Sequence, residues 1–128
     1  MIEIFKGVFG SQLYGTDTPE SDRDYKGIYL CSKEDLLLNR AKHHMSKSTK
    51  TGSGRLKNDK DDIDSEMFSI HRFFELAYGG DTCTIDMLHT PVDKTLVNSK
   101  EWEFIRNNRS KFYTKNMDSL LVYAFRQA

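Results

Sequence analysis

Hydrophobic and polar positions alternate along the first part of the chain in two extended stretches. Residues 3–9 alternate well enough to form a strand, and residues 23–30 form a second extended stretch. Between them, Ser11 is a good N-cap for a short helical segment over residues 12–14, and residues 15–21 are rich in turn formers. The pattern therefore predicts a strand, a short helix, a turn and a second strand.

The rest of the chain predicts one more strand, followed mainly by helices. The expected elements are a strand over residues 61–66, a helix over 68–78 that stops at Gly79, a short apolar element over 82–89 that Pro91 ends, and helices over 100–107 and 116–127. Strands that carry acidic residues, with helices between and after them, indicate an α/β or α+β fold. We expect a core over residues 1–90 and a C-terminal helical segment over residues 91–128.

Between these parts, every charged residue at positions 40–58 is basic, and the segment is rich in Ser, Thr and Gly. No apolar periodicity runs through it, so we expect a mobile basic loop over residues 41–60. Such a loop is either a solvated segment or a clamp over a triphosphate or a nucleic-acid acceptor once ligand is bound. The adjacent His43 and His44 have no further metal-binding residues near them in the sequence, which makes a zinc site improbable.

The overall composition narrows the function classes. The 128 residues contain 19 Lys plus Arg and 19 Asp plus Glu, so the net charge is zero and a globally basic nucleic-acid coat is excluded. No apolar run approaches the ~20 residues of a membrane span, and the N-terminus has no signal-peptide pattern. Cys31 and Cys83 lie far apart in the sequence, so a disulfide scaffold is not expected. We therefore expect a protein of the reducing cytoplasm.

Two aspartates at the start of the second strand carry the first chemical signal. Asp22 and Asp24 are two positions apart, and side chains on a strand alternate, so both carboxylates face the same way. Two carboxylates aimed at one spot repel each other unless a cation lies between them. Mg²⁺, or Mn²⁺ in its place, prefers such oxygen ligands together with substrate phosphates. The spacing predicts a divalent metal site.

Gly10 and Ser11 carry the second signal, because they lie at the predicted strand-to-helix turn. A helix N-terminus offers unpaired backbone N–H groups that suit a phosphate, and Ser11 can add a hydrogen bond from its hydroxyl. A phosphate-binding turn followed by a metal site is typical of enzymes that catalyse nucleotidyl or phosphoryl transfer.

The order of these motifs resembles a known superfamily. Gly-Ser, a spacer and Asp-x-Asp are similar to the nucleotidyltransferases of the DNA polymerase β type. The longer run from Gly10 to Tyr29, with Phe68–Phe73 and Thr84–Leu88, resembles predicted bacterial and phage nucleotidyltransferases linked to RNA repair. This resemblance implies a palm-like mixed sheet with flanking helices and three catalytic, metal-binding carboxylates. Asp64 matches the third carboxylate best, and Asp62, which would point the same way on a strand, is the rival.

Other residues near these motifs allow two interpretations each. Tyr14 stacks on a nucleotide base or belongs to the core, and Lys26 either helps to neutralise phosphate beside the metals or is simply exposed. We expect His71 to be a packed core histidine, and Asp86 to be a structural acid near the site. Gly10, Ser11, Tyr14 and Lys26 are the expected nucleotide-binding residues.

The resemblance implies an Mg²⁺-dependent enzyme that transfers a nucleoside monophosphate from an NTP to a hydroxyl of RNA, a protein or a small molecule. The alternative is a non-catalytic nucleotide-binding or regulatory module, similar to small antitoxin-type nucleotidyltransferases or to one half of a split enzyme. Members of the family generally continue beyond the point where this sequence stops. We therefore expect a natural minimal form, half of a split protein or a truncated chain.

The C-terminal segment also predicts association. Residues 100–127 carry many apolar side chains for two short helices, among them Phe104, Leu121, Val122 and Phe125. Unless both helices fold back on the sheet and bury them all, an apolar patch remains. We expect this patch to contact a second copy of the chain or another polypeptide.

Overall fold

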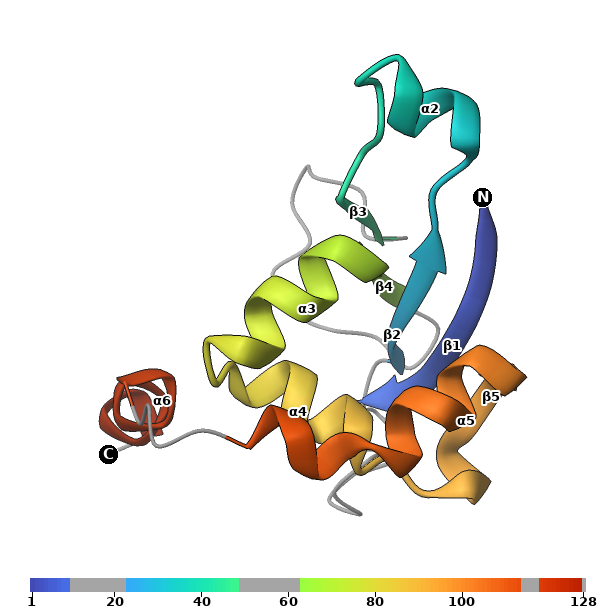
Figure 1. Cartoon of the computed structure of the whole chain (residues 1–128). Coiled ribbons are helices and arrows are strands. Elements are labelled where there is room, and N and C mark those ends of the chain that lie inside the picture. The colour runs from blue at the N-terminus through green and yellow to red at the C-terminus, as the bar shows by residue number, and fades with distance from the viewer. Residues whose placement is uncertain (10–22, 49–62, 114–117, 128) are drawn as a thin grey trace.

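The computed structural model describes residues 1–9, 23–48, 63–113 and 118–127. Its centre is a five-stranded mixed sheet in the order β3-β4-β2-β1-β5 (Figure 1). The strands are β1 (Ile2–Phe9), β2 (Arg23–Leu30), β3 (His44–Ser48), β4 (Ile63–Ser69) and β5 (Thr95–Asn98). A mixed sheet with flanking helices confirms the fold class expected from the sequence.

The pairing of the strands decides which ends of the sheet meet. β2 and β4 run parallel, whereas β1 pairs antiparallel with both β2 and β5, and β3 pairs antiparallel with β4. Phe9 at the end of β1 is the partner of Asp24, and Asp24 is in turn the partner of Asp64. The end of β1 and the beginnings of β2 and β4 therefore lie together at one end of the sheet.

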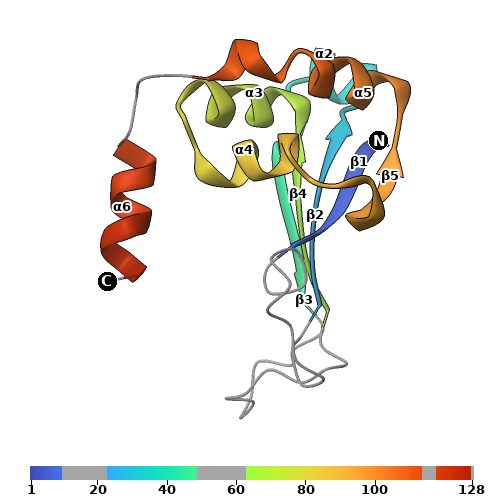
Figure 2. The same ribbon diagram turned by 90° about the horizontal axis from the view of Figure 1, so that it is seen from below.

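Helices cover only part of one face. The described helices are α2 (Lys33–Leu37), α3 (Ile70–Tyr78), α4 (Thr82–Leu88), α5 (Lys100–Asn107) and α6 (Asp118–Gln127), with short 3-10 turns η1 (Val92–Lys94) and η2 (Arg109–Phe112). In Figure 2, α3 and α4 lie side by side against the sheet, and β2, β3 and β4 extend past them. None of the described helices is long and apolar enough to cross a membrane.

Aromatic side chains join the helices to the sheet. The ring of Trp102, from α5, stacks on Phe5 of β1 with ring centroids 4.4 Å apart. Phe73 of α3 meets the same indole edge-on at 5.5 Å, and all three side chains are buried. Since Trp102 and β5 both follow residue 90, part of the C-terminal segment completes the sheet and the core. The division of the chain at residue 90 stays a prediction.

Most of the elements expected from the sequence are present. The strand over residues 23–30 and the helix over 100–107 have the expected bounds, and α3 ends beside Gly79 as the pattern predicts. The last helix is α6, whose Leu121, Val122 and Phe125 are exposed. Association through these side chains stays a prediction.

The prediction of a loop over residues 41–60 is wrong for His44–Ser48, which form β3. This edge strand is held by its backbone pairing with β4, and four of its five side chains are exposed while Met45 is half-buried. An edge strand that buries neither face has no apolar alternation, so the pattern gives no signal for it. Residues 49–60 lie outside the described residues.

The prediction of a packed core histidine at position 71 is also wrong. His71 is exposed on α3, and its ring meets the ring of His43 edge-on at 5.5 Å. The helix buries Phe73 and Ala77, which are four residues apart on one side. A residue two positions before Phe73 lies about 200° round the helix and so faces solvent.

The close approach of β1 and β4 to Gly27 generates a stability prediction. A Cβ at position 27 would lie 2.6 Å from the backbone oxygen of Phe5 and 2.6 Å from the sulfur of Met67. Because the backbone oxygen cannot move without shifting β1, we expect Gly27→Ala to reduce the free energy of unfolding by about 1–3 kcal/mol or more in urea denaturation.

Gly79→Ala is the matched control for this substitution. Its Cβ would meet nothing closer than 3.4 Å, and Gly79 has a φ of -80°, which alanine adopts freely. We expect a change within about 1 kcal/mol, in the stabilising direction. Equal stabilities of the two variants would contradict the close packing at Gly27.

Candidate active site

Two of the predicted carboxylates lie side by side where β2 and β4 begin. Asp24 and Asp64 are Cα partners in the parallel ladder, so their side chains leave the same face of the sheet. Both side chains are half-buried, and the Ser48 hydroxyl on β3 donates a hydrogen bond of 2.6 Å to Oδ1 of Asp64. The structure therefore brings together two acids that are 40 positions apart in the sequence.

A pocket of about 400 Å³ opens over this pair. Its walls include Asp24 and Lys26 from β2, Asp64 and Glu66 from β4, and Ser46 and Ser48 from β3. These residues alternate with the ones that face the other side of the sheet, so they form one polar strip across three strands. The strip lies on the same face as the buried Ile28 and Phe68 but nearer the end of the sheet.

The donor set of the pocket suits a hard divalent cation. Two carboxylates on adjacent strands repel each other, and oxygen ligands of this kind are the ones that Mg²⁺ and Mn²⁺ prefer. Among the described residues, no group of three or more His, Cys, Asp or Glu side chains could hold a metal ion. The described part of the chain thus brings Asp24 and Asp64 together without a larger cluster of such side chains.

All but one of the remaining predicted residues lie outside the described ranges. These are Gly10, Ser11, Tyr14 and Asp22, together with Asp62, the rival of Asp64. Gly10 follows Phe9 directly in the sequence, and Phe9 is the β1 partner of Asp24. The chain therefore enters the predicted phosphate-binding motif at the end of the sheet that carries Asp24 and Asp64.

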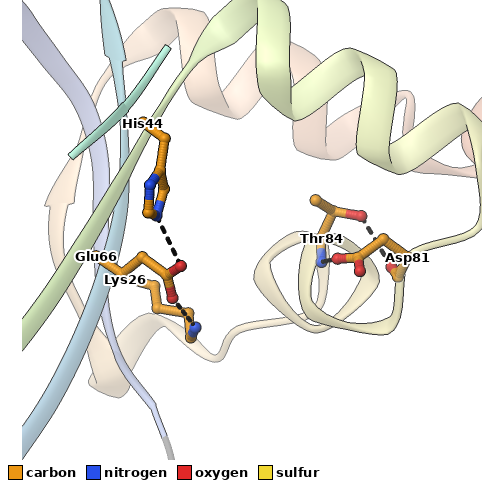
Figure 3. Close-up of polar contacts among 5 residues, drawn as sticks. All are labelled: Lys26, His44, Glu66, Asp81 and Thr84. Atoms are coloured by element: carbon orange, nitrogen blue, oxygen red, sulfur yellow. Dashed lines mark hydrogen bonds and ion pairs between the residues drawn. The ribbon is translucent and has the colours of Figure 1, made fainter. Parts of the chain in front are cut away.

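Lys26, the remaining predicted residue, forms an ion pair on the floor of the pocket. Its Nζ donates a hydrogen bond of 2.5 Å to Oε2 of Glu66, its Cα partner on β4. The other carboxylate oxygen of Glu66 lies 2.8 Å from Nε2 of His44 on β3. Figure 3 shows the three side chains in a row across the strands. Lys26 is therefore neither simply exposed nor unpaired.

The electrostatics of this row keep both partners charged. Burial alone would lower the pKa of Lys26, but the hydrogen bond to Glu66 outweighs it, with help from the nearby Cys83 and the Glu66 charge, so the pKa is raised. Burial alone would raise the pKa of Glu66, but the hydrogen bonds from Lys26 and His44 lower it below its usual range. At neutral pH the row contains an ammonium and a carboxylate.

Helix α4 begins near this row, because its Cys83 lies close to Lys26. Asp81 caps the helix, because its carboxylate accepts a hydrogen bond of 3.1 Å from the backbone N–H of Thr84 (Figure 3). Burial raises the pKa of the Cys83 thiol, on the first turn of α4, to about 11. Cys83 is thus a neutral thiol at physiological pH and not a nucleophile. Asp86 on the same helix is half-buried.

Sequence reasoning missed Glu66 and Ser48 as residues of the pocket, and His44 as the partner of Glu66. Glu66 had a usable signal, because it lies two positions after Asp64 on a predicted strand and so shares its face. His44 and Ser48 had none, since their segment was expected to be a loop.

The mixed sheet and the paired acids fit the polymerase β-type nucleotidyltransferases that the motifs resemble, and comparison with known families shows the membership. The chain belongs to the RNA repair pathway DNA polymerase beta family, whose model matches residues 3–123. This confirms the resemblance found in the motifs.

A relative is known from Enterobacteria phage T4. It is described as an uncharacterized 38.9 kDa protein in the nrdC-mobD intergenic region, and it is 47% identical to this chain over 130 residues. The match covers 100% of this chain and 38% of the relative. The chain therefore spans well under half the length of the relative that it matches.

The ion pair in the pocket generates a prediction about pH. The folded-state pKa of Glu66 is lowered, so the pair contributes stability above the ordinary pKa of 4.5 and loses it as pH falls through the folded value. We expect Glu66→Gln to be less stable than the wild type at pH 7. The difference should shrink steadily below pH 4.5 in urea unfolding.

Glu75→Gln is the control for this prediction. Glu75 pairs with Arg72 at 2.9 Å on the surface of α3, where its side chain is 66% exposed. Exposed pairs contribute little, so the substitution should change the stability by under about 1 kcal/mol. A stability difference for Glu66→Gln that stays constant from pH 7 to pH 3 would contradict the pairing with Lys26.

Proposed function

We propose that this chain is the catalytic part of a divalent-metal-dependent nucleotidyltransferase that transfers a nucleoside monophosphate from an NTP to a hydroxyl group. The observation that carries the proposal is the parallel register of Asp24 and Asp64 at the end of the sheet where the Gly10-Ser11 motif begins. Membership of a polymerase β-type family supports the same class of reaction.

The proposed reaction assigns a task to each group. Asp22, Asp24 and Asp64 would hold Mg²⁺ or Mn²⁺, which when bound supports both the attacking and the leaving oxygen. Gly10 and Ser11 would bind phosphate through backbone N–H groups and a hydroxyl, and Tyr14 would stack on the base. The acceptor hydroxyl oxygen would form a bond to the α-phosphorus and lose its proton to solvent, while the bond from that phosphorus to the pyrophosphate oxygen breaks.

The residues of the pocket fit this reaction electrostatically. An NTP carries a large negative charge, and the carboxylates would repel it unless cations lie between them. Lys26 adds a permanent positive charge two positions from Asp24 on the same face of β2. Ser48 orients Asp64 by donating a hydrogen bond to one of its carboxylate oxygens.

Transfer from labelled NTPs tests the proposal. Incubation with Mg²⁺, each α-labelled NTP and RNA or the protein itself as acceptor should give incorporated label with the wild type. Asp24→Asn and Asp64→Asn should each reduce the rate by more than about a hundredfold, because even an outer partner of a metal ligand costs up to that much. Asp93→Asn, on η1, is the matched control and should retain the wild-type rate.

The alternative function predicts a different result. A nucleotide-binding or regulatory module would bind NTP and metal with no incorporation of label into any acceptor. Transfer that persists in both Asp24→Asn and Asp64→Asn would contradict the assignment of the site.

Ligand-dependent stability provides a second measurement. A ligand that binds only the folded state raises the melting temperature by mass action, so Mg²⁺ together with an NTP should raise it more than either alone. Asp22→Asn plus Asp24→Asn should remove this synergy. Without metal, the double variant should melt at or above the temperature of the wild type, because two like charges have been removed from one site. Undiminished synergy in the double variant would overturn the metal assignment.

A further inference from the structure

Glu66 lies in the candidate pocket with both of its carboxylate oxygens in use. Oε2 accepts a hydrogen bond of 2.5 Å from the Lys26 ammonium, and Oε1 lies 2.8 Å from His44 Nε2. Its side chain is 36% exposed, and that of Lys26 is 25% exposed. An acid in this position, two residues from Asp64 and on its face, could serve either as another metal ligand or as an anchor for Lys26.

The contacts favour the anchor. A carboxylate that ligates Mg²⁺ has an oxygen directed at the ion, whereas each oxygen of Glu66 meets a nitrogen on a neighbouring strand. The backbone register fixes the partners on both sides, because Glu66 is paired with Lys26 on β2 and with Ser46 on β3, two residues from His44. The row therefore forms as soon as the strands pair.

The ion pair with Glu66 restricts the rotamers that the Lys26 side chain can adopt. A lysine ammonium on a flexible four-carbon stem loses rotamer entropy when it contacts a ligand. Glu66 engages one of the three N–H donors of Lys26, the Cys83 thiol lies within reach of a second, and the Lys26 side chain lines the pocket beside Asp24. A fixed ammonium in this place is prepared for a phosphate oxygen before the nucleotide arrives.

We propose that Glu66, held from the other side by His44, is a positioning residue that directs the Lys26 ammonium towards a phosphate of the bound nucleotide. This inference rests on the proposed function, because it assumes that the pocket binds an NTP. Lys26 would touch the substrate, whereas Glu66 and His44 would act through Lys26.

Steady-state kinetics and direct binding test the inference together. For Glu66→Gln and for Lys26→Met, we expect KM for the NTP to rise by about tenfold or more, as for the loss of one charge-assisted hydrogen bond. In both variants kcat should stay within about twofold of the wild type, because the metal-binding acids are intact. Isothermal titration with NTP and Ca²⁺ in place of Mg²⁺ should give losses of affinity of the same size.

The double variant distinguishes a positioning role from an independent one. If Glu66 acts through Lys26, Glu66→Gln should weaken NTP binding no further once Lys26→Met is present. Lys26→Met alone leaves a half-buried carboxylate without its cation and should melt at a lower temperature than the double variant, which removes that charge. The thermal measurement also separates lost binding from lost folding.

The chain offers matched controls for each change. Arg72→Met and Glu75→Gln remove the partners of a surface ion pair at 2.9 Å on α3, away from the pocket, and should leave KM unchanged. His44→Gln keeps a side-chain donor for Glu66 and should retain more affinity for the NTP than His44→Ala. This rescue would not be expected if His44 served only to hold the edge strand.

Three results would overturn the inference. One is an unchanged KM and NTP affinity in Glu66→Gln. Another is a Glu66→Gln variant with unchanged NTP affinity and a higher requirement for Mn²⁺, which would make Glu66 a metal ligand. The third is additive losses in the double variant. If the wild type binds NTP but transfers no label, the proposed function fails while the binding arm still tests Glu66; if it binds no NTP, both fail.

Discussion

The parallel pairing of β2 with β4 is the constraint on which the rest of the site depends. It places Asp24 beside Asp64 and Lys26 beside Glu66, so a single register determines both the acid pair and the ion pair. A slip of one residue would turn every one of these side chains to the opposite face. Gly27 lies between the two pairs and the hydrophobic core, where the approach of Phe5 and Met67 leaves no room for a Cβ. Packing at one glycine thus helps to keep the polar strip in register.

The two halves of the polar strip differ in the charges that they bring together. At the end of the sheet, two carboxylates stand next to each other, an arrangement that becomes favourable with a cation between them. One step further in, Glu66 is offset by Lys26 on one side and contacts His44 on the other. Nearer the core, where desolvation would make an unpaired carboxylate costly, Glu66 is paired.

The sequence allowed us to predict those elements and site residues that depend on local patterns. An extended pattern predicted β2 and helical spacing predicted α3. The two-residue period predicted Asp22 and Asp24 on one face, and of these two only Asp24 lies within the described residues. Asp64 could be selected only through the family resemblance, because nothing local says which strand lies next to β2. The contact of His44 with Glu66 could not be predicted, because the strand of His44 has no buried face and Glu66 is 22 positions away in the sequence. His71 was misjudged because the apolar residues of α3 near it face another side of the helix.

The long connection between β2 and β4 has a consequence for the order of folding. Parallel strands cannot be joined by a tight turn, and here residues 31–62 separate the two partners. Closing so long a loop costs chain entropy before any contact repays it, whereas the β1–β2 pairing spans a shorter separation and α3 follows β4 directly. We therefore expect the acid pair to be assembled late in folding. A nascent or partly folded chain carries the same aspartates without holding them together, so their side-by-side arrangement arises only with the finished sheet.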